Sequence, residues 1–174
     1  LENLEMNELF WKNKKVLITG HTGFKGAWLS IWLHRLGAEI VGLSLEPPTK
    51  KNIYDRSKIK NLTKSLRGDI RNYSTVEKVI KKYKPEIIFH LAAQAIVLDS
   101  YEKPLETYET NVIGSMNILE AARQCLSKCS IIMVTSDKCY KNERGKKIFK
   151  EGSELGGKDI YCLLYTSPSP RDLS

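Results

Sequence analysis

The chain has 174 residues, of which 41% are hydrophobic and 28% are charged, a composition typical of a globular domain with one hydrophobic core. No apolar run approaches the roughly 20 residues that a membrane helix needs, and the first residues contain no signal-peptide core. The net charge of +8 comes from dispersed Lys and Arg residues, which favours a solvated surface over a nucleic-acid site. We therefore expect a cytoplasmic protein with no membrane and no nucleic-acid partner.

The first part of the chain predicts strands and helices in alternation. A continuous apolar run at 14–20 ends in glycine, which is typical of a strand buried on both faces of a parallel sheet. Residues 23–37 predict a helix that stops at a glycine, and residues 38–45 and 64–69 predict the second and third strands. We expect this helix to bury one apolar stripe, formed by Trp28, Leu29, Trp32, Leu33 and Leu36.

The same alternation continues to residue 136. Residues 74–84 predict an amphipathic helix with Ser74 as its N-cap and an inner face formed by Val76, Val79, Ile80 and Tyr83. Residues 85–93 and 130–136 predict the fourth and fifth strands. Between them, residues 104–126 predict a long helix whose apolar face carries Val112, Met116, Leu119 and Ala122. Strands alternating with helices in this way predict right-handed βαβ units and an α/β fold with a doubly wound parallel sheet, as in Rossmann-like domains.

The turn after the first strand, GHTGFKG, contains Gly20, Gly23 and Gly26. A strand, a glycine-rich turn and a helix N-terminus together form an anion site, since glycines let the backbone approach a pyrophosphate and unpaired helix N–H groups face its charge. The spacing differs from the G-x-G-x-x-G fingerprint. The alternative interpretation is a tight strand-to-helix turn whose glycines serve packing alone.

The cysteines indicate neither a metal site nor a redox site. Cys125, Cys129, Cys139 and Cys162 match no zinc or thioredoxin spacing. Cys125 and Cys129 have helical i, i+4 spacing, and we expect them to pack in a core as reduced thiols.

Several motifs, in order, carry a resemblance to a known family. They are T-G-x-x-G-F-x-G after the first strand, G-D-I-R at 68–71, H-L-A-A-Q at 90–94, N-V-x-G at 111–114 and T-S-D-K-C-Y at 135–140. Over residues 10–161 the chain resembles the extended short-chain dehydrogenase/reductase family of NAD-dependent epimerases and dehydratases. The sequences of these motifs are most similar to those of the nucleotide-sugar 4,6-dehydratases that act on CDP-glucose in 3,6-dideoxyhexose and O-antigen biosynthesis.

The resemblance implies NAD as the cofactor and assigns residues to it. Gly20, Gly23 and Gly26 would cradle the pyrophosphate, Asp69 and Ile70 would border the adenine, and Ala92, Ala93 and Gln94 would line the nicotinamide side. The other residues assigned to the cofactor are Thr22, Phe24, Leu91 and Asn111. Two plainer interpretations stay open: Asp69 caps a turn, and the alanines are small residues for close packing. Glu46, after the second strand, is a candidate for the ribose hydroxyls, which would favour NAD over NADP.

The resemblance also implies catalytic roles for Ser136, Asp137, Lys138 and Tyr161. Ser136 would hold the sugar 4-hydroxyl, Tyr161 would take its proton, Asp137 would act as the acid, and Lys138 would assist at C5. The alternative for Asp137 and Lys138 is an exposed charged pair at a strand end. Related 4-epimerases carry small uncharged residues after the serine, so the charged pair favours a dehydratase.

The last residues depart from the family pattern. Relatives have a Tyr-x-x-x-Lys pair, whereas the position four residues after Tyr161 holds Tyr165. The stretch CLLYTSPSPRD can be encoded by DNA that resembles a transposon-end sequencing adapter. We therefore expect residues 1–161 to be an incomplete NAD-binding domain that lacks the C-terminal substrate domain, and residues 162–174 to be a non-native tail. A natural Ser/Pro-rich tail is the alternative.

These expectations give a ranked set of functions. The first is the N-terminal part of a homodimeric, NAD-dependent dehydratase that takes CDP-glucose as its substrate, with this chain inactive by itself. The second is another nucleotide-sugar dehydratase or a 4-epimerase, and the third is a non-catalytic dinucleotide-binding module.

Overall fold

The computed structural model describes residues 8–136, 140–141 and 148–156 of the chain. The chain forms two compact units. One comprises residues 1–92 and 113–134, and the other comprises residues 93–112 and 135–174. The expected Asp137, Lys138 and Tyr161, and the whole expected tail, lie outside the described residues.

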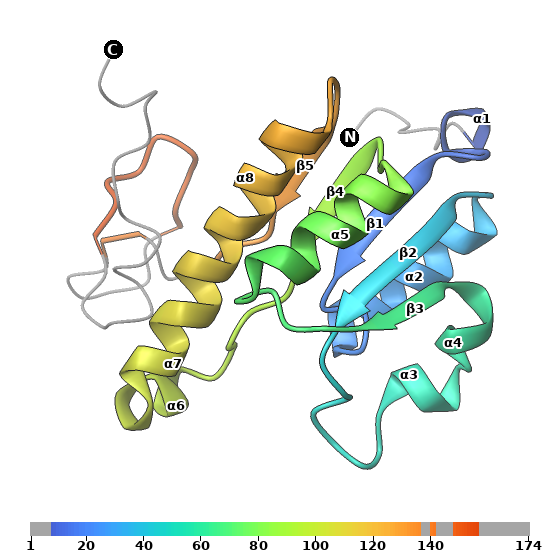
Figure 1. The fold of residues 1–174 in the computed structure, drawn as a ribbon. Helices are drawn as coiled ribbons and strands as arrows, with labels where there is room; N and C mark the ends of the chain where they lie inside the picture. Colours follow the sequence, from blue (N-terminus) through green and yellow to red (C-terminus); the bar gives the residue numbers. More distant parts are fainter. Residues whose placement is uncertain (1–7, 137–139, 142–147, 157–174) are drawn as a thin grey trace. The chain divides into compact units, whose positions relative to one another are not determined.

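A five-stranded, all-parallel sheet forms the first unit (Figure 1). Its strand order is β3-β2-β1-β4-β5, with every neighbouring pair parallel. The strands are β1 (Lys15–Thr19), β2 (Glu39–Ser44), β3 (Lys64–Arg67), β4 (Ile87–His90) and β5 (Ser130–Met133). The chain winds outward from β1 to β3, returns to β4 beside β1, and then winds the other way. The predicted doubly wound sheet is therefore confirmed, and its switch point lies between β1 and β4.

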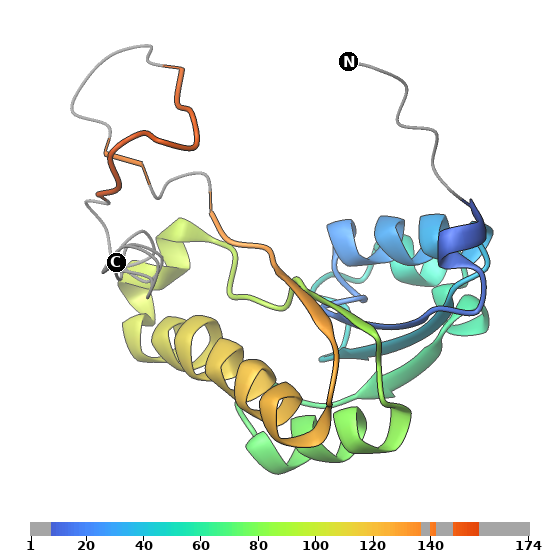
Figure 2. The ribbon, with the colours of Figure 1, turned by 90° about the horizontal axis from the view of Figure 1, so that it is seen from above.

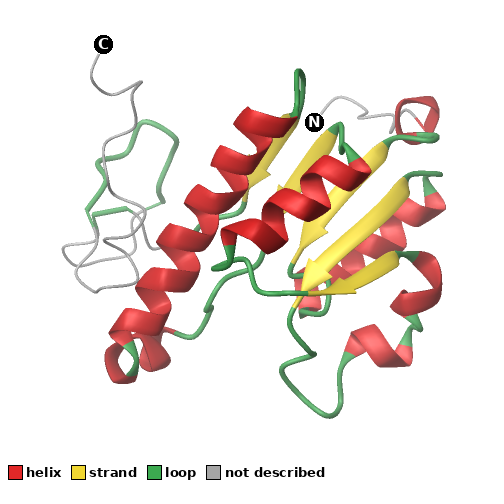
Figure 3. Cartoon of the chain, in the orientation of Figure 1, coloured by secondary structure: helices red, strands yellow, loops and turns green. Residues whose placement is uncertain are grey.

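Helices cover both faces of this sheet. Figure 2 shows α5 (Tyr73–Tyr83) and α8 (Gly114–Cys125) on one face and α2 (Phe24–Arg35) on the other. The short helices α1 (Glu8–Trp11), α3 (Ile53–Arg56) and α4 (Ile59–Leu62) complete the unit. Figure 3 shows the yellow strands behind α5 and α8 and in front of α2.

Each face of the sheet has its own buried core. Leu17 of β1 belongs to the cluster under α5 and α8, whereas Val16 and Ile18 belong to the cluster that contains Leu33 of α2. Alternate side chains of one strand therefore enter opposite cores, which explains the continuous apolar runs.

The predicted apolar stripe of the helix after β1 is partly wrong. Leu33 and Leu36 are buried, but Trp28 and Trp32 are 53% and 50% exposed. The helix instead buries small residues, which are Gly26, Ala27 and Ser30. The Ser30 hydroxyl donates to the Gly26 carbonyl at 2.8 Å, so its burial leaves no unpaired donor. Small side chains allow close packing, and a pattern of large apolar residues does not detect them.

The predicted long helix from 104 to 126 is also divided differently. It consists of α7 (Pro104–Tyr108), a π-helical segment η1 (Glu109–Ile113) and α8. Alpha-helix α8 buries Gly114, Ile118, Ala121 and Ala122, whereas Met116 and Leu119, which were expected on the inner face, are exposed. Ala122, which was also expected on the inner face, is buried. The buried stripe of α8 consists of Ile118 and small residues, which a search for large apolar residues does not detect.

For α5 (Tyr73–Tyr83), the helix after β3, the predicted buried face is confirmed, but the predicted N-cap residue is wrong. Val76, Val79 and Ile80 are buried, and Tyr83 packs against the same core. The N-cap is Asn72, whose side chain accepts a hydrogen bond from the Thr75 backbone N–H at 3.1 Å. Ser74 instead donates to the Asn72 side chain at 2.8 Å. Asn and Ser are both good caps, so composition alone did not separate them.

The second unit is smaller in its described part. It contains α6 (Val97–Glu102), α7 and most of η1, together with an antiparallel bridge between Tyr140 and Leu155. The Tyr140 ring stacks on Phe149 with 5.1 Å between centroids. Among the described residues no helix has the length and apolar character to cross a membrane.

The face of α8 gives a direct test of the packing. Ile118→Ala removes a fully buried side chain and should lower the free energy of unfolding by about 3 kcal/mol. Leu119→Ala removes a similar volume from the exposed neighbour and should cost less than about 1 kcal/mol. Equilibrium urea unfolding measures both, and equal losses would contradict the observed register of α8.

Candidate dinucleotide-binding site

The glycine turn joins the end of β1 to the start of α2. Gly20 adopts a left-handed conformation with φ of 75°, and its N–H donates to the Leu43 carbonyl at 2.9 Å. Gly23 is the N-cap of α2, and no side chain caps the helix. Because the first N–H groups of a helix have no intrahelical acceptor, this end of α2 can bind an anion.

The space around Gly20, Gly23 and Gly26 shows why a larger residue would not fit at two of these positions and would fit more easily at the third. A Cβ on Gly20 would lie 2.8 Å from the Ala92 nitrogen, and a Cβ on Gly26 would overlap the Gly20 carbonyl oxygen. Packing alone therefore accounts for Gly20 and Gly26. A Cβ on Gly23 would meet only the Gly20 oxygen, at 3.3 Å, so the space beside Gly23 remains for a ligand that approaches the backbone.

Thr22 connects this turn to the second strand. Its buried hydroxyl donates to the Leu45 carbonyl at 3.1 Å and lies 2.7 Å from the Ser44 hydroxyl. Since a hydroxyl has one proton, Ser44 is the donor of the shorter bond. Thr22 thus fixes the turn against the end of β2. Phe24, the first residue of α2, is 72% exposed.

A buried polar network fixes the end of β4 beside the turn. The Thr19 hydroxyl accepts from the N–H groups of Leu91 and Ala92, both at 3.2 Å, and lies 2.7 Å from His90 Nδ1. With its acceptor sites filled, Thr19 donates its proton to His90 Nδ1. Neutral His90 then carries its own proton on Nε2 and donates it to the Ser115 hydroxyl at 3.1 Å. This network holds Leu91 and Ala92 against Gly20.

Motif reading did not assign Thr19 or Ser115 any function. The sequence does show that two apolar strands each end in a polar residue, Thr19 in β1 and His90 in β4. In the structure these two residues are paired in the register of β1 and β4. Buried polar groups need hydrogen-bond partners, but the partners lie 71 residues apart.

Asp69 and Ile70 occupy a turn after β3. The Asp69 carboxylate accepts from the Arg71 side chain at 2.6 Å and from the Arg71 backbone N–H at 2.9 Å. These hydrogen bonds hold the pKa of Asp69 below its usual value. These hydrogen bonds within the turn agree with the simpler of the two interpretations of Asp69, in which its carboxylate caps a turn. The Ile70 side chain is buried in the core, where it fills the space that a Cβ on Gly114 would enter.

In the second unit, Gln94 and Asn111 are held together by two hydrogen bonds. The Gln94 N–H donates to Asn111 Oδ1 at 2.8 Å, and Asn111 Nδ2 donates to the Gln94 carbonyl at 3.1 Å. Gln94 Nε2 donates to the Ile96 carbonyl at 2.9 Å, while Gln94 Oε1 is buried without a partner among the described residues. An orphaned acceptor of this kind fits a ligand with an N–H donor, such as a carboxamide. Ala93 is exposed and Ser136 half-buried.

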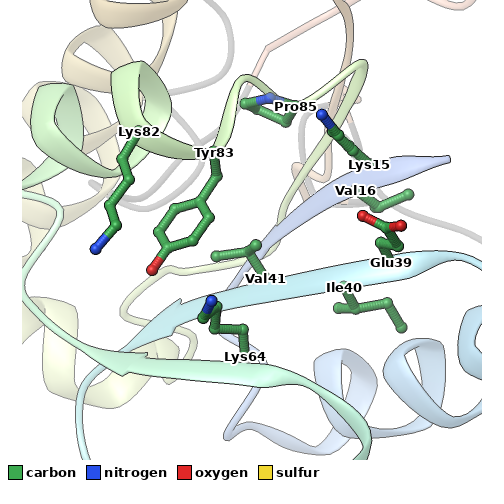
Figure 4. A pocket seen from close by; sticks show the side chains of 9 residues that line it. All are labelled: Lys15, Val16, Glu39, Ile40, Val41, Lys64, Lys82, Tyr83 and Pro85. Carbon is green, nitrogen blue, oxygen red and sulfur yellow. The ribbon is translucent and has the colours of Figure 1, made fainter. Parts of the chain in front are cut away.

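A surface pocket of about 410 Å³ lies at the amino ends of the strands, whereas the glycine turn lies at their carboxyl ends (Figure 4). It is bordered by the first residues of β1, β2 and β3, which are Lys15, Glu39 and Lys64, and by Tyr83. Ligands of doubly wound sheets bind at the carboxyl ends of the strands, so this pocket is not part of the candidate site. No group of three or more His, Cys, Asp or Glu residues in the described part could hold a metal ion.

Comparison with known proteins agrees with this geometry. Residues 17–162 match the family model described as GDP-mannose 4,6 dehydratase. Over 152 residues the chain is 43% identical to the CDP-glucose 4,6-dehydratase of Salmonella typhimurium, covering 87% of this chain and 42% of that enzyme. Over 129 residues it is 38% identical to the CDP-paratose 2-epimerase of Salmonella typhi, covering 72% of this chain and 38% of that enzyme.

The fold has close counterparts among solved structures. The Thermus thermophilus UDP-glucose 4-epimerase, solved in complex with NAD, matches with a TM-score of 0.74 and 28% identity, covering 87% of this chain and 47% of that chain. A Stenotrophomonas maltophila UDP-glucose-4-epimerase matches with a TM-score of 0.76 and 20% identity, covering 87% of this chain and 45% of that chain. The chain spans less than half the length of these relatives.

The parallel sheet and its glycine turn at the switch point define a dinucleotide-binding domain of the Rossmann type. The chain belongs to the NAD-dependent epimerase/dehydratase family that the GDP-mannose 4,6 dehydratase model describes, and NAD is the cofactor of that family.

The two buried histidines give the unit a predictable response to acid. Burial lowers the pKa of His90 to about 4, and burial together with the nearby Arg67 charge lowers the pKa of His21 to about 4. Both side chains are protonated more readily in the unfolded chain, where the pKa is about 6.5. Stability should therefore fall as the pH drops from about 6.5 toward 4, by up to about 3 kcal/mol for each histidine.

Urea midpoints between pH 7 and pH 4.5 measure this loss. His90→Gln should flatten the pH dependence of stability by the contribution of this one histidine. An unchanged slope in His90→Gln would show that His90 does not contribute to acid destabilisation.

Proposed function

We propose that this chain is the N-terminal, NAD-binding part of a nucleotide-sugar 4,6-dehydratase that converts CDP-glucose to CDP-4-keto-6-deoxyglucose. The observation that carries the proposal is the 43% identity over 152 residues to a CDP-glucose 4,6-dehydratase. Because the chain spans 42% of that relative, we assign the activity to a full-length protein. The chain alone would be inactive, since Tyr165 stands at the position of the lysine that partners Tyr161.

The glycine turn supports the binding of NAD. The backbone at Gly23 and the N-terminus of α2 would meet the diphosphate, with Gly20 and Gly26 allowing the close packing of the turn and Thr22 holding it to β2. Asp69 and Ile70 would border the adenine through the turn after β3. By the family resemblance Ala92, Ala93 and Gln94 would line the nicotinamide side, and within the second unit the buried Gln94 acceptor offers a partner for the carboxamide.

The chemistry requires a sequence of proton transfers at the sugar. Bound NAD would supply the hydride chemistry, which oxidises C4 and later reduces C6. Ser136 would hold the 4-hydroxyl while the Tyr161 phenolate takes its proton, which leaves a 4-ketone that acidifies the C5 hydrogen. Removal of the C5 proton, assisted by Lys138, and protonation of the departing 6-hydroxyl by Asp137 then eliminate water.

A 4-epimerase is the second candidate, since the chain matches the fold of a UDP-glucose 4-epimerase at 28% identity. Epimerisation needs no acid for a leaving hydroxyl at C6. The charged pair Asp137 and Lys138 therefore favours elimination over epimerisation.

The cellular role follows from the proposed product. A 4-keto-6-deoxy sugar nucleotide is a precursor of the 3,6-dideoxyhexoses in bacterial surface polysaccharide. The nucleotide-activated form of such a sugar is made in the cytoplasm. We propose that the full-length protein works there as a homodimer.

Assay of the full-length protein with separate sugar nucleotides tests the proposed activity. CDP-glucose should yield a 4-keto product with characteristic absorbance in base, with a kcat/KM at least about tenfold above those for UDP-glucose and GDP-mannose. Interconversion of C4 epimers without a keto product would identify the epimerase, and turnover of UDP-glucose alone would reject the proposed nucleotide.

Asp137→Asn tests the assigned acid. Loss of a general acid should lower kcat by about 100-fold or more while leaving NAD binding intact. Asp55→Asn, the same chemical change at an exposed position of α3, should leave kcat unchanged. A kcat within threefold of the parent in Asp137→Asn would remove Asp137 from the mechanism.

A further inference from the structure

The residue between Gly20 and Thr22 in the glycine turn is a buried histidine to which the sequence motifs assign no role. His21 is fully buried, and its Nε2 lies 2.7 Å from the Ser65 hydroxyl of β3. Its ring packs edge to face against the Tyr54 ring of α3, with 5.5 Å between the centroids. A single side chain therefore joins the turn after β1 to β3 and to α3.

Strand β2 leaves room for this side chain at one residue. Gly42 is the register partner of Ser65, and a Cβ on Gly42 would lie 2.3 Å from His21 Cγ. Among the described residues the glycines with a positive φ are Gly20 and Gly37, so the backbone conformation of Gly42 does not require glycine. A glycine inside a strand often marks the close approach of another group, and here that group is the imidazole, which crosses β2 to reach Ser65.

The Ser65 hydroxyl is itself held by two further side chains. It lies 2.7 Å from the hydroxyl of the buried Tyr54 and accepts from Arg67 Nη1 at 3.3 Å. Arg67 Nε in turn donates to Glu46 Oε1 at 2.6 Å, so this network ends at the surface in an ion pair. Because buried hydrogen-bond networks rigidify the groups that they connect, Ser65 is a firm anchor for His21.

We propose that His21 is a positioning residue for the dinucleotide, which holds the backbone around Gly23 in the conformation that receives the diphosphate. This inference rests on the proposed NAD-binding function. Because His21 is fully buried, it acts through the backbone of the turn. The Gly20 N–H binds the Leu43 carbonyl and Thr22 binds the end of β2, so His21 completes the attachment of residues 20–22 to the neighbouring strands. A turn that is ordered in advance loses less conformational entropy when it binds a ligand.

NAD binding to the full-length protein, measured by titration calorimetry, tests the proposal when urea unfolding of each variant is measured beside it. His21→Phe keeps a ring over Gly42 and removes the hydrogen bond to Ser65, so the NAD dissociation constant should rise by about tenfold. His21→Gln keeps a polar group within reach of Ser65 and should bind NAD within about threefold of the parent. His34→Phe, the same change at an exposed position of α2, should leave the NAD affinity unchanged.

Gly42→Ala tests whether the space in β2 serves His21. The added Cβ would displace the imidazole, so NAD should bind about tenfold more weakly. In a His21→Ala background the ring is already absent, and Gly42→Ala should change the NAD affinity by less than about threefold. An equal loss in both backgrounds would show that Gly42 acts without His21 and would overturn the proposal.

The outcomes separate this inference from the proposed function. If the folded parent protein binds no NAD, the proposed function fails. If the parent binds NAD, and His21→Phe lowers the urea midpoint but leaves the NAD dissociation constant unchanged, His21 serves stability alone and only the positioning role is overturned. An equal loss of NAD affinity in His21→Phe and His21→Gln would also overturn it, whereas a loss that occurs in His21→Phe and not in His21→Gln supports it.

Discussion

The structure depends on the close contact between the glycine turn and the backbone that leaves β4. Gly20 sits in a left-handed conformation with no room for a Cβ against Ala92, and the Thr19 hydroxyl binds the two N–H groups of the opposing segment. This contact joins the strands on either side of the switch point. The N-terminus of α2, which follows the carboxyl end of β1, has no side-chain cap, so an anion can bind there.

Much of the fold could be predicted from the sequence, since burial of a parallel sheet on both faces imposes continuous apolar runs. All five expected strands are present, and the inner face of α5 is confirmed. The faces of α2 and α8 could not be assigned in the same way. In α2 small residues provide the packing surface while Trp28 and Trp32 are exposed. In α8 Ile118 packs together with small residues, while Met116 and Leu119 are exposed.

The candidate site was predictable where a motif has a local cause. The glycine turn is such a case, because the left-handed conformation of Gly20 and the close approach of Gly26 to the Gly20 carbonyl arise within the turn itself. Two other features depend on partners that only the fold brings together. They are the hydrogen-bond network of Thr19, His90 and Ser115 and the ion pair between Glu46 and Arg67. Packing also explains residues that resemblance assigns to the cofactor, since the Ile70 side chain lies in the core. The roles of Ser136, Asp137, Lys138 and Tyr161 stay predictions.

The central claim is that the backbone beside Gly23 receives the diphosphate of NAD. Measuring the NAD released on denaturation of the purified full-length protein, beside that of a Gly23→Val variant, tests it most directly. The parent should carry or take up stoichiometric NAD, and Gly23→Val should lose it while keeping its secondary structure, because a branched side chain covers the free helix amides. A folded parent protein that neither carries nor takes up NAD, or a Gly23→Val variant that retains it fully, would contradict the account.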